Sequence, residues 1–91
     1  MAVKVKLPTQ LRAAAGGEGE VLLEGDTVGA VLDGLYAQHA ELRDRIADAD
    51  GTLRRFVNVY VNGEDIRFGD GLQTPVPPGA ELQILPAVAG G

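Results

Sequence analysis

The chain has 91 residues, enough for one small domain around a single hydrophobic core. Hydrophobic residues make up 45% of it and charged residues 23%, a balance that is typical of a folded domain and argues against disorder. The formal net charge of -5 argues against nucleic acid as a partner and favours a partner with a basic surface.

Cysteine is absent, which excludes disulfides, thiolate metal sites and a thioester on one of the chain's own side chains. No apolar run approaches the roughly 18 residues that span a bilayer. The N-terminal residues also lack the apolar stretch of a signal peptide. We therefore expect a cytoplasmic protein with no membrane partner.

The first half of the chain predicts two strands and a helix. Residues 3–7 alternate valine or leucine with lysine, and Val21 and Leu23 repeat this period of two after a loop rich in alanine and glycine, so the two strands form a hairpin. Gly25-Asp26-Thr27 then supplies a helix start. The apolar stripe that follows has helical spacing, and residues 40–49 extend the pattern as a second short helix or a bent continuation.

The second half predicts three more strands. Residues 53–61 alternate valine with larger or polar side chains, and Asn62-Gly63 is the preferred pair for a type I′ turn into a short return strand over residues 65–68. A proline-rich loop over residues 75–79 precedes the last strand, residues 81–85, which ends at Pro86.

This order of elements predicts an α+β fold of the β-grasp, or ubiquitin-like, type. About five strands form a mixed sheet packed on one main helix, in a domain over residues 1–86 that is followed by a flexible C-terminal tail over residues 87–91. The predicted core brings together the inward residues of the strands and the helix: Val3, Val5, Leu7, Val21, Leu23, Val57, Val59, Val61, Leu82, Ile84, Val28, Val31, Leu32 and Leu35.

The same alternation places Phe56, Tyr60 and Leu85 on the opposite face of the sheet, beside the lysines of the first strand. Either they are ordinary cross-strand pairs or they form a docking patch for a partner.

The last five residues, Ala87-Val88-Ala89-Gly90-Gly91, form an uncharged tail that has no side chains on its final two residues. Because glycine lacks a Cβ atom, such a tail can enter a narrow channel in another protein and adopt conformations closed to other residues. The reacting group would then be the terminal carboxylate. A frayed chain end is the alternative interpretation of two terminal glycines.

Four segments together resemble the sulfur-carrier proteins of the MoaD/ThiS superfamily: Ile84 to Gly91, Gly25 to Val31, Arg55 to Asn62, and Glu64 to Phe68. The resemblance covers essentially the whole chain. Within the superfamily it is greatest for the branch of carriers that serves cysteine biosynthesis.

The resemblance implies a protein cosubstrate rather than an enzyme. An E1-like enzyme would adenylate the carboxylate of Gly91, and sulfur transfer would convert it to a thiocarboxylate, while Ala87 to Gly90 insert into the partner. In the cysteine branch, a PLP-dependent cysteine synthase would use that sulfur and a zinc peptidase would release the cysteine. ATP and PLP would belong to these partners and not to this chain.

Other candidate sites are weak. His39 is the only histidine, so no histidine-based triad or histidine cluster for a metal can form, and no Gly-x-x-x-x-Gly-Lys loop for phosphate is present. Glu64 and Asp65 are neighbours on a strand and point to opposite faces, so they cannot act as an acid-base pair. We predict no catalytic residue and no metal site.

Two other functions remain open. One is the small subunit of molybdopterin synthase, which a stable complex with the large subunit would reveal. The other is a ubiquitin-like modifier, for which the tail would be found joined to lysines of other proteins.

Overall fold

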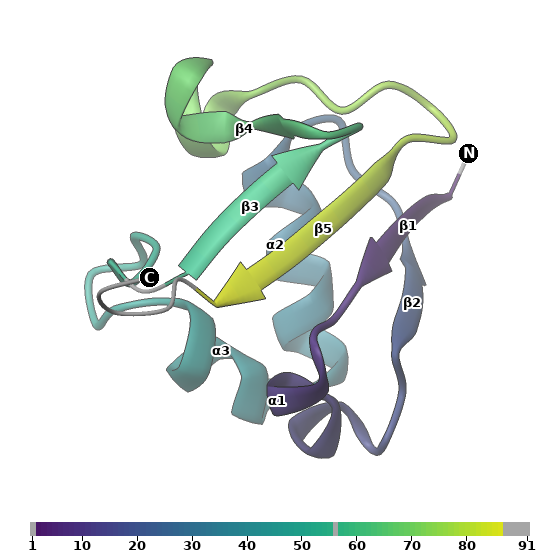
Figure 1. The fold of residues 1–91 in the computed structure, drawn as a ribbon, viewed down its shortest axis with the longest axis vertical. Helices are drawn as coiled ribbons and strands as arrows, with labels where there is room; N and C mark the ends of the chain where they lie inside the picture. The colour runs from purple at the N-terminus through teal and green to yellow at the C-terminus, as the bar shows by residue number, and fades with distance from the viewer. Residues whose placement is uncertain (1, 56, 87–91) are drawn as a thin grey trace.

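The alternating segments form one five-stranded mixed sheet in the order β2-β1-β5-β3-β4 (Figure 1). The computed structural model describes residues 2–55 and 57–86. Strand β5 is central, parallel to β1 on one side and antiparallel to β3 on the other, whereas β2 and β4 pair antiparallel with β1 and β3. The strands are β1 (Val3–Lys6), β2 (Glu20–Leu23), β3 (Val57–Val61), β4 (Glu64–Asp65) and β5 (Glu81–Pro86). This is the β-grasp arrangement predicted from the sequence.

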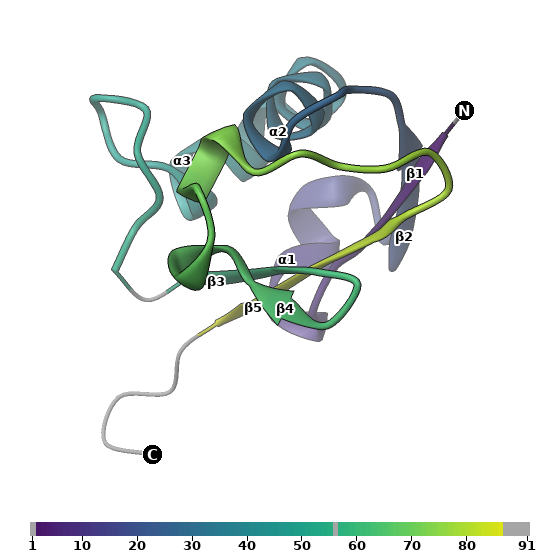
Figure 2. The same cartoon turned by 90° about the horizontal axis from the view of Figure 1, so that it is seen from above.

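The main helix, α2 (Val28–Gln38), packs across one face of the sheet (Figure 2). It starts where the sequence predicts, because the Thr27 Oγ1 atom accepts a hydrogen bond of 3.2 Å from the backbone N–H of Ala30. The chain then leaves helical geometry at His39 (φ -135°, ψ 81°), and a separate helix, α3 (Ala40–Ile46), follows. The second helical segment is therefore a distinct short helix and not a bent continuation of the first.

The core lies between the sheet and these helices. Every residue predicted for it is buried, and none of the described residues that are buried is polar or charged. Leu42 and Ile46 of α3 join this core, together with Ile66 and Val76 from the second half of the chain. In the described part of the chain, no helix is both long enough and apolar enough to cross a membrane.

The strand predicted over residues 53–61 begins later, at Val57, so this prediction was wrong at its N-terminal end. The backbone N–H of Arg54 donates to the Ile46 carbonyl at 2.9 Å, and Leu53 makes an isolated bridge with Ala47. The segment before Val57 therefore pairs with the end of α3 and does not extend β3.

The predicted return strand over residues 65–68 was also wrong in its length. The Asn62-Gly63 turn forms with positive φ at both residues, but β4 ends at Asp65 and a 3₁₀ turn, η2 (Ile66–Phe68), follows. The Asp65 Oδ1 atom accepts a hydrogen bond of 2.9 Å from the backbone N–H of Arg67. This cap turns the chain, and Ile66 enters the core.

Three short helices lie outside the elements predicted from the sequence. They are α1 (Thr9–Arg12) and the 3₁₀ turns η1 (Ala13–Ala15) and η3 (Gly71–Gln73). The turn η1 follows α1 directly and ends at Gly16, whose φ of 68° suits glycine.

Two glycines give a matched test of how closely α2 packs. A Cβ atom on Gly25 would lie 2.8 Å from the Val31 backbone nitrogen, whereas one on Gly34 would lie 3.5 Å from the Leu23 Cδ2 atom, an ordinary contact. We expect Gly25→Ala to lower the free energy of unfolding by roughly 1–3 kcal/mol. Gly34→Ala should raise it by about 0.5–1 kcal/mol, because alanine favours the helix. Urea unfolding measures both, and equal effects of the two variants would contradict the packing.

The raised pKa of Tyr36 should make the free energy of unfolding fall in alkaline solution. Burial raises the pKa of Tyr36 to about 12, and the nearby Asp33 carboxylate adds to this rise. The positive charge of Arg43 lowers the pKa and so works against both. Between pH 10 and about 12 the unfolded chain loses this proton while the folded chain keeps it, so the free energy of unfolding falls across this window. Tyr36→Phe should show a smaller fall when urea unfolding is compared at the two ends of the window. The same fall in both proteins would rule out Tyr36 as its source.

Candidate functional site

The central strand β5 determines where the C-terminal segment leaves the domain. Leu82 and Ile84 point into the core with no exposed surface, and β1 and β3 hold the strand from both sides. Its last residue, Pro86, pairs with Val57 at the start of β3. The tail root, which we define as Pro86, is therefore fixed by the sheet. The predicted sulfur-carrying Gly91 and the tail residues Ala87, Val88, Ala89 and Gly90 lie outside the described residues.

Two of the three predicted docking residues share the outer face of the sheet, away from α2. Tyr60 pairs in register with Gln83, and Leu85 pairs with Asn58, so Tyr60 and Leu85 are diagonal neighbours on β3 and β5. Both side chains are half-buried. The third predicted residue, Phe56, lies outside the described residues. We call Tyr60, Gln83, Leu85 and Asn58 the outer patch.

The outer patch is uncharged, in contrast to the neighbouring half of the same face, which β1, β2 and the start of β5 form. There the Lys6 Nζ atom lies 3.6 Å from the Glu81 Oε2 atom, and about four-tenths of each side chain is exposed, so solvent screens this pair. Asn58 Oδ1, within the outer patch, is shielded from solvent and has no hydrogen-bond partner among the residues that the structure describes. An uncharged surface beside the tail root is suited to contact with another protein.

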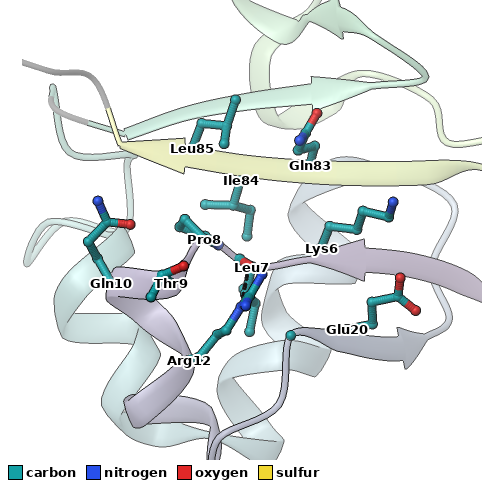
Figure 3. Close-up of a pocket in the computed structure, with 11 residues that line it drawn as sticks. Lys6, Leu7, Pro8, Thr9, Gln10, Arg12, Glu20, Gln83, Ile84 and Leu85 are labelled. Atoms are coloured by element: carbon teal, nitrogen blue, oxygen red, sulfur yellow. Dashed lines mark hydrogen bonds between the residues drawn. The ribbon is translucent and has the colours of Figure 1, made fainter.

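A hollow of about 780 Å³ adjoins the outer patch between the ends of β1 and β5 and helix α1 (Figure 3). Lys6, Gln83 and Leu85 line its sheet side, and Thr9 and Gln10 line its helix side. The Arg12 Nε atom donates to the Leu7 carbonyl at 3.1 Å, which holds α1 against the end of β1.

Sequence reasoning missed this hollow because it treated residues 8–19 as a plain loop. The signal was present, since leucine, arginine and three alanines favour a helix and Gly16-Gly17 favours its end.

The described residues offer little for catalysis. No group of three or more histidine, cysteine, aspartate or glutamate side chains in residues 2–55 and 57–86 could hold a metal ion. His39 is half-buried at the junction of α2 and α3. Asp65 is occupied as the cap of η2, while Glu64 is exposed. What the geometry provides is a binding surface beside the tail root.

The chain matches the ThiS family over residues 5–91. It is 48% identical to the sulfur carrier protein CysO of Mycobacterium tuberculosis, over 93 aligned residues that cover 100% of both chains. Among solved structures, CysO in the BexX/CysO complex of Amycolatopsis orientalis superposes with a TM-score of 0.91 at 48% identity, covering 99% of this chain and 100% of that one. The small archaeal modifier protein SAMP1 of Haloferax volcanii superposes with a TM-score of 0.85 at 34% identity, covering 100% of both chains.

The family match spans nearly the whole chain, and it agrees with the β-grasp sheet and with the position of the tail root at the end of β5. The curated relative of Mycobacterium tuberculosis is named a sulfur carrier protein. The chain therefore belongs to the ThiS family, as a carrier protein rather than an enzyme.

Proposed function

We propose that this protein carries sulfur as a thiocarboxylate on Gly91 and donates it in the biosynthesis of cysteine. The observation that supports this most directly is the similarity to CysO carriers over the full length of both chains, which includes the terminal glycines. The fixed tail root supports it as well, because a partner that binds the outer patch receives the tail from a defined point.

A free carboxylate is a poor electrophile and must be activated first. In the proposed cycle an E1-like enzyme binds ATP, and a Gly91 carboxylate oxygen attacks the α-phosphorus, so that pyrophosphate leaves and an acyl-adenylate forms. Hydrosulfide from the sulfur source then attacks the carbonyl carbon, AMP departs, and the S–H proton is lost to solvent. The product is a thiocarboxylate at Gly91. This chain supplies only the acyl group, and the partner supplies the nucleotide site.

The thiocarboxylate sulfur then attacks the acceptor that a PLP-dependent cysteine synthase prepares from an activated serine. The acyl group migrates from sulfur to nitrogen, which leaves cysteine joined to Gly91 by an amide bond. A zinc peptidase hydrolyses that bond and regenerates the carboxylate. Each partner must admit the tail, so two terminal residues without side chains suit all of them.

The outer patch is the proposed docking surface for these partners. Tyr60 supplies aromatic area and Leu85 supplies apolar area next to the tail root, and Phe56 belongs to the same proposal.

A second candidate is a ubiquitin-like modifier, favoured by the similarity to the small archaeal modifier protein SAMP1. In that function an amine of another protein would attack the activated Gly91 carbonyl and form an amide bond. The two functions share the adenylation step and differ in the nucleophile that follows.

Any added bulk at the end of the tail should block activation and leave the fold intact. We expect Gly90→Val, and separately one alanine added after Gly91, to lower ATP–pyrophosphate exchange by the E1-like enzyme of the same organism by at least about a hundredfold, about 2.7 kcal/mol. The thermal midpoint should stay at the wild-type value, because neither change alters any of the core residues that the structure describes. Normal exchange by either variant would refute the proposed role of Gly91.

Two leucines on the outer face provide a matched test of docking. Leu85 belongs to the outer patch, whereas Leu22 on the edge strand β2 is 64% exposed and lies in the charged half. We expect Leu85→Asp to raise the Kd for the E1-like enzyme by at least about tenfold, and Leu22→Asp by less than about twofold. Isothermal titration calorimetry measures both, and circular dichroism checks the fold. If the two variants weakened binding equally, the outer patch would not be the docking surface.

A further inference from the structure

Two arginines lie near Val57, the residue that pairs with the tail root: Arg55 precedes β3, and Arg67 belongs to η2. Val57, which pairs with Pro86, donates its backbone N–H to the Arg54 carbonyl at 3.0 Å. From the other side, the Arg67 Nη2 atom on η2 donates to the Val57 carbonyl at 3.1 Å and to the Arg55 carbonyl at 3.4 Å. In Figure 1 the loop before β3 lies at the same end of the sheet as the tip of β5. These contacts hold the guanidinium group of Arg67 beside Val57, and Arg55 lies two residues before Val57 in the chain.

Of Arg54, Arg55 and Arg67, only Arg54 forms a salt bridge with a carboxylate of the described residues. Arg54 is held by the Asp44 carbonyl at 2.8 Å and by the Asp48 carboxylate at 3.7 Å. Arg55 and Arg67 are exposed, and no carboxylate of residues 2–55 and 57–86 forms a salt bridge with either of them. This is notable in a chain with 13 acidic and 8 basic side chains, because carboxylates are in excess. Arg67 uses only Nη2 on the backbone, which leaves its Nε and Nη1 donors available.

We propose that Arg55 and Arg67 bind carboxylates at the mouth of the channel through which partner enzymes receive the tail. This inference rests on the proposed carrier function and adds a second contact surface to the outer patch. Carboxylates are the expected ligands because the guanidinium group matches their planar geometry. The hydrogen bonds from Arg67 to the Val57 and Arg55 carbonyls keep its guanidinium group near the tail root. Because this side chain is already ordered, less conformational entropy is lost on binding.

The length of the tail indicates that these arginines contact the partner protein and not the nucleotide bound to it. Five residues can span at most about 18 Å, so a tail extended in a channel places the reacting carboxylate that far from its root. The nucleotide must be at the reacting end. The arginines are at the root, so they face the channel mouth rather than the phosphates.

The test uses the full chain and the purified E1-like enzyme of the same organism. Arg55→Glu is the test variant, since no described contact depends on the Arg55 side chain. Arg43→Glu is the control and makes the same change in charge on α3. The Arg43 side chain lies near Tyr36 of α2, whose pKa it lowers. We expect Arg55→Glu to raise the Kd at least about tenfold at low salt and much less at high salt, and Arg43→Glu to change it less than about twofold.

Equal effects of the two variants, or an effect of Arg55→Glu that does not depend on salt, would overturn the inference. So would a raised KM for ATP with an unchanged Kd for the carrier, because that result would assign the arginine to the nucleotide. In each of these cases the wild-type carrier would still bind and be adenylated, so the carrier function would stand. If the wild-type chain were neither bound nor adenylated, the proposed function itself would fail.

Discussion

The pairing of β5 with β1 and β3 is the constraint on which the rest of the structure depends. It joins the N-terminal hairpin to the β3–β4 hairpin, and it turns Leu82 and Ile84 into the core beneath α2. Because the strand is held along both edges, Pro86 has a fixed position beside Val57. A short tail can be delivered accurately only from a fixed root, so the same pairing that closes the sheet also serves the proposed chemistry.

The two faces of the sheet divide the remaining tasks. The inner face is wholly apolar and stabilises the domain, whereas the outer face has the uncharged outer patch on one half and the Lys6–Glu81 pair on the other. None of the buried residues that the structure describes is polar. In the proposed function the carrier needs no acid, base or metal of its own, because each partner would bring these groups to the tail.

The sequence predicted those features that depend on periodicity and on single turn residues. Alternation identified the sheet and the core, Thr27 marked the start of α2, and Asn62-Gly63 marked the turn. It failed where tertiary contacts override local pattern: Arg54 pairs with the end of α3 instead of extending β3, and the Asp65 cap converts the return strand into η2. The position of Arg67 could not be foreseen, because its contact with the Val57 carbonyl joins residues that no sequence pattern relates.

The most direct measurement is the intact mass of the protein before and after incubation with ATP, a sulfur source and extract of its own host, with the C-terminal peptide sequenced. The proposed function predicts that sulfur replaces one oxygen at Gly91, or that a cysteine is added there, and the cysteine adduct would identify the cysteine branch. An unmodified Gly91 in a free chain would contradict it, and so would a chain joined only to lysines of other proteins.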